Sequence, residues 1–489
     1  MRYEIVFPAG AWPGVLKHLL GQGSDEQLAF LLAGTARGSG WRRLLVREAI
    51  AVPAGAFVRQ TGNYLAVKPE FSQGVLRRCY EEGLSLIEAH SHPFAGRDVA
   101  FSALDLANEE LKFRYVASRI PHVTHATLVV GQDSLDAHVW DRRSRRTVPV
   151  DCIRILDQPI TDLLPTSHEL PGENVPDPAP WLHRQALAFG SAAQQRMERV
   201  RVGVVGCGGT GSLVVQMLAH LGVRRLVLVD PDVVEVSNLN RLVGARPADA
   251  RNGRYKVDVA RRLARSISHN VQVRALPLSV ADPAAVAALK GLDLLFGCTD
   301  NDGSRLILNR MAVQYLIPYL DLGAGLQAAP GGRLSAGGGQ VRLVRPGSFC
   351  LACIDGIDRV RAARDLQPLL DRRRHADRGY VQDNDLPTPA VLFLNCAVAA
   401  LAMAEFVNLW TGYRAPTPLA YFDLLASRLA PAQAERQPDC IACGEGGSLG
   451  LGDLEPLPGV ATTPPAGIGT CAWPPAPETQ THLERVKGR

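Results

Sequence analysis

Two histidines separated by one residue, with an acid further along the chain, are the first residues that could do chemistry. His90 and His92 lie in Glu-Ala-His-Ser-His-Pro, and Asp105 follows in Ser-Ala-Leu-Asp. Residues two apart on an extended segment project to the same side, so both imidazoles can reach one ion. With one carboxylate they leave the fourth position of a tetrahedral Zn²⁺ for water, as in hydrolytic sites. We predict a zinc site; a surface turn is the alternative.

A glycine-rich turn opens the second half of the chain. It lies between an apolar run and a helix expected from about Ser212, and it holds Gly206, Gly208, Gly209 and Gly211. Glycines let backbone amides approach a phosphate at a helix N-terminus, where the dipole favours an anion. Asp230 ends the next apolar run, where a carboxylate can bind a ribose. On these features alone a dehydrogenase would be the natural interpretation.

The residues after Asp230 favour an ATP-binding enzyme instead. Asp232 leads into Ser-Asn-Leu-Asn-Arg, which ends at Arg241, and Lys256 and the Cys-Thr-Asp-Asn containing Asp300 follow. Hydride transfer does not need these groups near the phosphates. Nucleotidyl transfer does, because it loads charge onto the α-phosphate and the departing pyrophosphate. We expect Arg241 and Lys256 to neutralise that charge and Asp300 to hold Mg²⁺.

Two Cys-x-x-Cys pairs provide a third constellation. They are Cys350 with Cys353 and Cys440 with Cys443. Two such turns present four thiolates in the arrangement of a closed structural zinc site. Redox-active dithiols are the alternative, but nothing in the sequence indicates thiols of low pKa. We therefore predict a second, structural Zn²⁺.

The first motif set resembles the JAMM (JAB) metalloproteases. It consists of His-Ser-His-Pro, then Ser-x-x-Asp, with an acid before an apolar segment that ends in Gly. The resemblance implies that Glu26 is the general base and that Ser102 helps to hold the oxyanion. It also implies cleavage after the C-terminal Gly of ubiquitin-like proteins. The alternative for Glu26 is an acid at a helix N-terminus, where it has a capping role.

Asp98 is an alternative to Asp105 as the metal ligand that follows the two histidines. The loop between His92 and Ser102 is longer than the usual pattern of the JAMM family, and Asp98 lies within it. We prefer Asp105 because its Ser-x-x-Asp unit is intact. Ligation by Asp105 rather than Asp98 is therefore the expectation.

The second motif set resembles the ubiquitin-activating-type (ThiF-like) adenylyltransferases, including those that activate sulfur carriers. The match runs from about Arg184 to Cys443. It implies that Asp230 binds the ribose and that Asn238, Arg241 and Lys256 contact the phosphates of ATP, while Asp300 positions Mg²⁺. Arg184 matches an arginine that this family supplies to the neighbouring subunit, which implies a homodimer. A surface salt bridge is the alternative for Arg184.

A cysteine for thioester transfer is missing from its usual place. Family members that pass their substrate to a thiol carry a cysteine between the two Cys pairs, yet residues 371–389 contain none. Cys396 lies just beyond, within an apolar segment where a buried inert thiol is expected. Cys471 is in the tail. The thioester step stays open.

The order of the elements predicts two α/β domains. Strands are expected at 44–46, 84–89 and 126–130, and a mostly parallel, doubly wound Rossmann-like sheet with a zinc knuckle is expected from Trp181. The domains are residues 1–155 (JAMM type) and 181–445 (adenylation). Residues 156–180 are proline-rich and expected to be a linker, and residues 446–489 a disordered tail. The apolar run 390–410 contains two Asn and a Glu, which favours a buried helix over a membrane span.

Length and composition exclude several classes of protein. The chain has 489 residues, 46% of them hydrophobic and 21% charged, which is typical of a globular protein of two or three domains. A net charge of +5 indicates neither a nucleic-acid nor a membrane partner. Ten cysteines are too few for a disulfide scaffold. No signal peptide is evident, so we expect a cytoplasmic protein.

Together the motifs predict a bifunctional enzyme of a ubiquitin-like modifier system. Zinc-dependent trimming or removal of the modifier would be followed by ATP-dependent adenylation of its C-terminal Gly. The partner would be a small ubiquitin-like or sulfur-carrier protein, with a conjugating enzyme or a sulfurtransferase downstream. One alternative is activation of a sulfur carrier for cofactor or cysteine biosynthesis. Another is a peptidase half that only binds the modifier.

Overall fold

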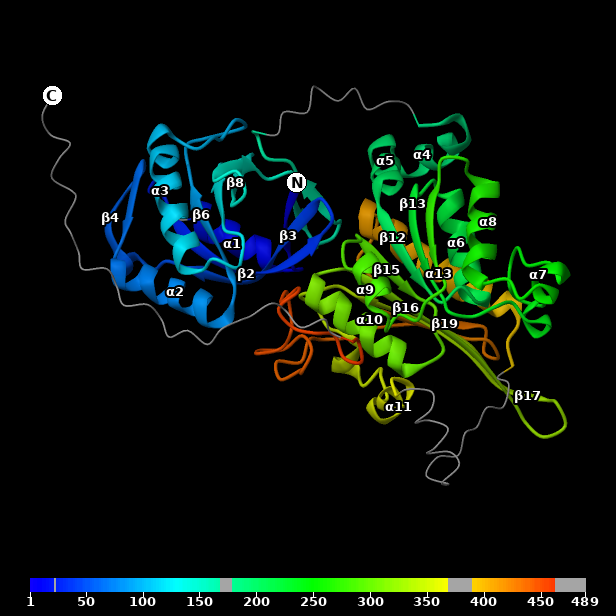
Figure 1. Cartoon of the computed structure of the whole chain (residues 1–489). Coiled ribbons are helices and arrows are strands. Elements are labelled where there is room, and N and C mark those ends of the chain that lie inside the picture. The colour runs from blue at the N-terminus through cyan, green and yellow to red at the C-terminus, as the bar shows by residue number, and fades with distance from the viewer. Residues whose placement is uncertain (22, 168–177, 368–388, 462–489) are drawn as a thin grey trace, which may run out of the picture.

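Two lobes, each built around one β-sheet, make up the chain (Figure 1). The structure is a computed structural model that describes residues 1–21, 23–167, 178–367 and 389–461. The N-terminal lobe is blue to cyan in Figure 1, and the C-terminal lobe is green to orange. The chain therefore forms two α/β domains, in agreement with the alternation of apolar runs in the sequence.

The N-terminal domain is a mixed sheet with the strand order β11-β10-β1-β3-β2-β6-β7-β8-β9. The expected strands at 44–46, 84–89 and 126–130 lie within β3, β6 and β7. The strands are β1 (Arg2–Phe7), β2 (Leu28–Gly38), β3 (Trp41–Ala51), β6 (Ser85–Ser91), β7 (Ala126–Val130), β8 (Leu135–Asp141), β9 (Arg146–Pro149), β10 (Cys152–Ile155) and β11 (Thr161–Leu163). A hairpin of β4 (Phe57–Thr61) and β5 (Tyr64–Val67) stands apart from this sheet.

Helices cover both faces of this sheet. One face packs on α1 (Ala11–Leu20) through a cluster that includes Ile5, Phe7 and Leu44. Part of the other face packs on α2 (Pro69–Glu82) and α3 (Ala103–Arg119) through a cluster that includes Phe30, Leu32 and Leu86. Side chains alternate between the faces of a strand, so His90 shares the α2/α3 face with Leu86.

The C-terminal domain is a doubly wound sheet with the strand order β14-β13-β12-β15-β16-β17-β18-β19. Its first five strands are parallel and the rest are antiparallel. The strands are β12 (Arg201–Val205), β13 (Arg225–Val229), β14 (Gln272–Leu276), β15 (Leu294–Gly297), β16 (Tyr319–Ala328), β17 (Leu334–Val344), β18 (Leu419–Asp423) and β19 (Arg428–Ala432). The chain reverses its winding between β12 and β15, where ligands bind in sheets of this type.

Helices flank this sheet. They are α4 (His183–Phe189), α5 (Ser191–Arg199), α6 (Gly209–His220), α7 (Pro247–Arg251), α8 (Lys256–Ile267), α9 (Pro283–Leu289), α10 (Asp302–Tyr315), α11 (Arg359–Asp365) and α13 (Leu392–Thr411). By length and composition alone α13 could cross a membrane, but 61% of its most apolar window is buried in the protein. It packs on α6 and β17 as a core helix, as the sequence predicted.

The structure differs from the sequence prediction at several places. The segment after Glu26 is the strand β2, so Glu26 caps no helix there. Within the predicted linker, residues 161–163 form β11 and pair with β10. Within the predicted disordered tail, residues 446–461 pack between the two domains, and we call this segment the strap (orange-red in Figure 1). Residues 462–489 lie outside the described residues.

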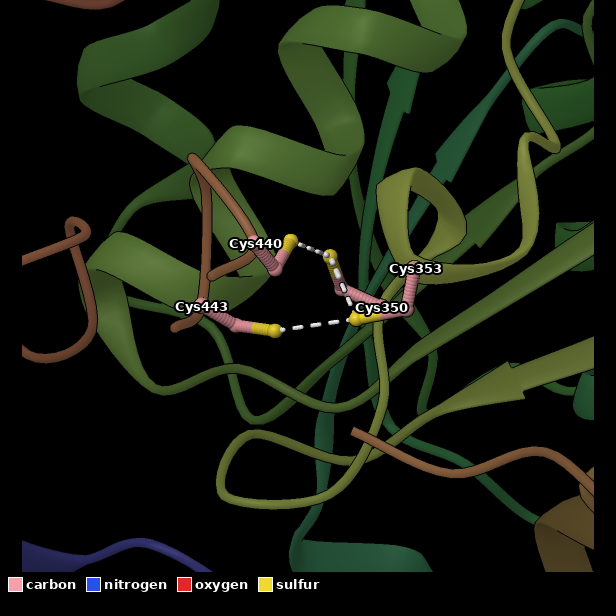
Figure 2. Close-up of side chains that lie close together, drawn as sticks. All are labelled: Cys350, Cys353, Cys440 and Cys443. Atoms are coloured by element: carbon pink, nitrogen blue, oxygen red, sulfur yellow. Dashed lines mark hydrogen bonds between the residues drawn. The ribbon is translucent and has the colours of Figure 1, made fainter. Parts of the chain in front are cut away.

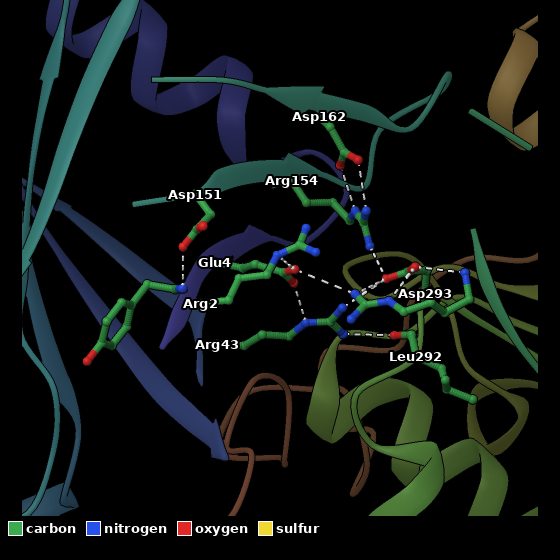
Figure 3. A network of polar contacts seen from close by, with 10 residues as sticks. Arg2, Glu4, Arg43, Asp151, Arg154, Asp162, Leu292 and Asp293 are labelled. Carbon is green, nitrogen blue, oxygen red and sulfur yellow. Dashed lines mark hydrogen bonds and ion pairs between the residues drawn. The ribbon is translucent and has the colours of Figure 1, made fainter. Parts of the chain in front are cut away.

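A buried network of charges joins the two domains (Figure 3). Asp293, which precedes β15, pairs with Arg43 of β3, Arg154 of β10 and Arg201 of β12. Glu4 of β1 pairs with Arg43 at 2.6 Å, and Arg43 also donates to the Leu292 carbonyl. Three arginines and two acids thus pair in the interface, where an unpaired charge would be costly.

The N-terminal domain contacts the C-terminal sheet at the amino ends of β12 and β15. The loops that follow these two strands lie at the opposite end of the sheet. Arg201 is the first residue of β12 and Asp293 directly precedes β15, and both contact the N-terminal domain. Gly206 and Cys298 directly follow these two strands. The five residues of β12 span about 17 Å. Groups at the carboxyl ends of these strands therefore point away from the N-terminal domain.

Candidate functional sites

The N-terminal site is assembled where β6 ends and α3 begins. His90 lies on β6 and His92 directly follows that strand, while Asp105 lies in the first turn of α3. Ser102 is the N-cap of α3: its Oγ donates to Asp105 Oδ2 at 2.7 Å and accepts from the Asp105 amide. This reciprocal capping fixes the Asp105 carboxylate opposite the histidines. The structure thus gives Ser102 a capping role beside its predicted one.

These three side chains have the spacing of metal ligands. The His90 and His92 Nε2 atoms lie 3.6 and 3.4 Å from Asp105 Oδ2, and the three ligand atoms all lie within 4.8 Å of one another. Zinc bonds of 2.0–2.1 Å in a tetrahedron place ligand atoms about 3.3 Å apart. Among the described residues, the buried Nε2 of His90 has no hydrogen-bond partner. The donor set therefore fits a zinc ion, and the exposed Asp98 is outside it.

Glu26, two residues before β2, faces the same site. Its Oε1 lies 3.6 Å from His92 Nε2. Its backbone is held by Thr61, whose carbonyl accepts from the Glu26 amide, and by Gln60, whose side chain donates to the Glu26 carbonyl. Burial raises the pKa of the Glu26 carboxyl, so this group is poised to accept and return a proton.

A cavity of about 850 Å³ surrounds these polar groups. The wall from β2, α2 and the β4–β5 hairpin is largely apolar, whereas α3 lines the cavity with polar residues such as Asn108, Glu109 and Lys112. Phe94, which is 74% exposed, stands at the cavity, and an ion pair of Glu88 with Lys112 lies along it. The site can therefore receive an extended chain with a polar centre and apolar flanks.

In the C-terminal domain the glycine turn connects β12 to α6. Gly206 has φ +87°, and a Cβ there would overlap the Cys298 carbonyl. A Cβ on Gly211 would overlap the Gly206 carbonyl. The helix starts at Gly209 rather than near Ser212, and no described side chain caps it. Its first N–H groups are therefore available to an anion.

Two aspartates follow β13 and differ in their surroundings. Asp230 is buried, and its carboxylate accepts from the amides of Cys207 (2.6 Å) and Asp232 (2.9 Å). Burial raises the pKa of Asp230 despite these bonds. Asp232 is exposed and pairs with Lys256, the first residue of α8, at 2.8 Å. The hydrogen bonds of Asp230 thus link the ends of β12 and β13. Lys256 is held in place by the exposed carboxylate of Asp232.

The predicted nucleotide residues other than Gly211 line one cavity of about 810 Å³, whereas Gly211 is buried in the first turn of α6. Arg241 donates to the Ser237 carbonyl at 2.8 Å, and the buried Asn238 accepts from the Glu235 amide, which shapes this loop. The lining includes Gly206, Gly208, Gly209, Asp230, Asp232, Asn238, Arg241, Lys256 and Asp300. Arg184 is exposed on α4 and is not part of this lining in its own chain.

Two further lining residues were missed in the sequence. Arg305 of α10 reaches Asp321 Oδ1 at 3.2 Å and the Thr299 carbonyl at 3.1 Å. Asn395 of α13 lies against Gly209, where a Cβ would overlap its amide nitrogen. A polar residue within the apolar run 390–410 was the available signal for Asn395. Arg305 gave no such signal, because its pairing with Asp321 depends on the tertiary fold.

The four predicted cysteines meet in one cluster (Figure 2). The Sγ of Cys350 lies 3.7 Å from that of Cys440 and 3.9 Å from that of Cys353, and those of Cys353 and Cys443 are 3.3 Å apart. Zinc–sulfur bonds of 2.3 Å in a tetrahedron place sulfurs about 3.8 Å apart. The donor set fits a structural zinc ion. Cys396 is half-buried on α13, and Cys471 and most of the 371–389 loop lie outside the described residues.

The chain belongs to the ThiF family, which it matches over residues 182–442. A mouse relative, "Adenylyltransferase and sulfurtransferase MOCS3", is 30% identical over 258 residues, which are 53% of this chain and 50% of the relative. The "SAMP-activating enzyme E1" of Haloferax volcanii is 28% identical over 271 residues, which are 54% of this chain and 88% of that protein. The chain thus spans about half the length of the mouse relative.

A solved structure of E. coli MccB with ATP is also similar. It is 21% identical, with a TM-score of 0.42, and the match covers 56% of this chain and 76% of MccB. The residues that match the ThiF family begin at Leu182, so they leave out the N-terminal domain.

Proposed function

We propose that the C-terminal domain uses ATP and Mg²⁺ to adenylate the C-terminal carboxylate of a small protein. The N–H groups after Gly208 would bind phosphate oxygens, and Arg241 and Lys256 would exchange their present partners for the charge on the phosphates. Asp300 would hold Mg²⁺, which adds positive charge beside the pyrophosphate. The carboxylate attacks the α-phosphorus, the bond to the bridging oxygen breaks, and pyrophosphate leaves.

The shape of the cavity supports a slender chain end as the substrate. After Leu322, the lining residues of β16 are Gly323, Ala324 and Gly325, so this part of the wall has almost no side chains. A C-terminal Gly can pass such a wall where a residue with a large side chain cannot. The names of the relatives, which refer to sulfurtransferase and SAMP-activating proteins, support a sulfur-carrier or ubiquitin-like substrate.

We propose that the N-terminal domain is a JAMM-type zinc peptidase that cuts after the same terminal Gly. His90, His92 and Asp105 would hold the ion. Zinc bound there would supply a Lewis acid and an activated water. Glu26 would take a proton from the attacking water and deliver it to the departing amine, and Ser102 would keep Asp105 in place. The unpartnered Nε2 of His90, next to His92, whose Nε2 faces Glu26 at 3.6 Å, carries this proposal.

A sulfur-carrier pathway is the second candidate, favoured by relatives named as sulfurtransferases and by the sulfur carrier ThiS adenylyltransferase of Bacillus subtilis. In either pathway we propose a cytoplasmic homodimer, in which Arg184 reaches the partner's nucleotide.

Exchange of labelled pyrophosphate into ATP tests the adenylation step. We expect exchange with a small ubiquitin-like protein that ends in Gly and none when that Gly is amidated. Exchange without any protein substrate would contradict the proposal. Lys256→Ala should lower exchange about 100-fold, since it removes a charge-assisted contact in the transition state.

A further inference from the structure

The strap, residues 446–461, contacts the N-terminal domain backbone to backbone. The Asp453 amide donates to the Thr35 carbonyl at 2.8 Å, and the Arg37 amide donates to Asp453 Oδ2 at 2.9 Å. A Cβ on Gly34 would overlap the Gly450 carbonyl. Such an approach requires a residue without a side chain at position 34, so the two segments fit each other closely.

The other side of the strap is fixed to the adenylation domain. The Gln314 side chain of α10 donates to the carbonyls of Gly452 (2.7 Å) and Glu455 (2.6 Å). Lys290 pairs with Asp453 at 2.8 Å. The strap follows directly on the cysteine cluster, and the Ser448 amide donates to the Ala442 carbonyl. The strap is thus held by the adenylation half and presented to the other half.

Two partly buried leucines of the strap pack against the core of the N-terminal domain. Leu451 and Leu454 pack on the cluster under α2 and α3, which also contains Leu28, Phe30, Leu76, Leu86 and Val116. All five of these residues line the cavity around His90. The strap leucines therefore support, from outside, the apolar cluster that forms the cavity wall. Packed cores transmit the loss of a side chain to their neighbours.

We propose that Leu451 and Leu454 are positioning residues for the N-terminal site, which the adenylation domain supplies through the strap. They set the apolar wall along which the substrate chain lies, without touching the metal ligands on β6 and α3. This inference rests on the proposed peptidase function. It makes the adenylation half a structural requirement for productive cleavage.

Steady-state cleavage of an extended precursor by the full chain tests this inference. In Leu451→Ala/Leu454→Ala we expect KM to rise about tenfold, with kcat within twofold, zinc content unchanged and pyrophosphate exchange within twofold. Leu457→Ala is the matched control, because this strap leucine packs in the adenylation core. Its cleavage should stay within twofold of wild type. Replacement of Leu451 and Leu454 by Met should restore KM.

Hydrogen exchange gives a readout that needs no activity. Amides of β6 and α2 should exchange faster in the double variant than in wild type, and remain unchanged in Leu457→Ala. An unchanged KM together with unchanged hydrogen exchange of the β6 and α2 amides would overturn the positioning role. If wild type cleaves no precursor, the peptidase function fails, while faster exchange confined to the double variant would still support the strap contact.

Discussion

Asn395 on α13 fills the space where a side chain on Gly209 would lie. This contact places a core helix against the first residue of α6, where we propose that the phosphates bind. Gly209→Ala should therefore lower the affinity for ATP about tenfold, as its Cβ displaces Asn395 and also crowds Arg241. Isothermal titration with ATP measures this change.

The same contact supplies a control. Asn395→Ala in the Gly209→Ala background removes the overlapping amide and should recover part of the lost affinity. If the double variant binds ATP no better than Gly209→Ala, the steric explanation is wrong.

His125 makes the stability of the N-terminal domain depend on pH. It is buried; its Nδ1 accepts from the Leu86 amide, and its Nε2 faces the Ile120 carbonyl, which requires the neutral ring. Burial lowers its pKa to about 4, against about 6.5 in the unfolded chain. The stabilisation is complete above pH 6.5 and is lost as the pH falls through 4, by about 3 kcal/mol.

Urea unfolding of wild type and His125→Gln between pH 4 and 7 tests this. The difference between their free energies of unfolding should shrink as the pH falls, because Gln does not titrate. A difference that is the same at every pH would contradict the prediction.

Asp293 should hold the two domains together. Its carboxylate is 3% exposed and faces three arginines. Asp293→Asn should cost about 3–5 kcal/mol, because it leaves these buried charges without their common partner. Calorimetry should then show two separate transitions. Asp162→Asn is the control: it also pairs with Arg154, but it is 41% exposed, and it should cost less than about 1 kcal/mol.

The opposite placement of interface and nucleotide cavity predicts that the two reactions are independent. The zinc site is three strands from β1 in the N-terminal sheet, or about 14 Å, and β12 adds about 17 Å. A trimmed protein must leave one site before it enters the other. An equal mixture of Glu26→Gln and Lys256→Ala chains should then process a precursor as fast as wild type at equal active-site concentrations. A much slower mixture would indicate direct transfer.

Much of both sites could be predicted because their residues are local in sequence. The His-x-His unit, the Ser-x-x-Asp unit, the glycine turn and the Cys pairs each lie within one strand end or turn. Backbone geometry brings the residues of each unit together. The tertiary fold then brings the units together, and it places Asp105 rather than Asp98 beside the histidines.

Contacts between distant segments could not be predicted in this way. In the sequence, nothing distinguishes Asp293 from any other acid that precedes a strand. Its three arginine partners come from three different strands. The sequence of the strap is rich in Gly and Pro, which predicted a disordered tail. In the structure its glycines permit close contact with β2. Such partners are defined only by the tertiary fold.

Pyrophosphate exchange with an extended precursor tests the central claim most directly, since it requires both sites to act on one chain end. With wild-type protein, exchange should begin after a lag in which the precursor is trimmed to its terminal Gly. Glu26→Gln should show no exchange with the precursor and normal exchange with the trimmed protein. Equal exchange of Glu26→Gln with both substrates, or none with the trimmed protein, would contradict the account.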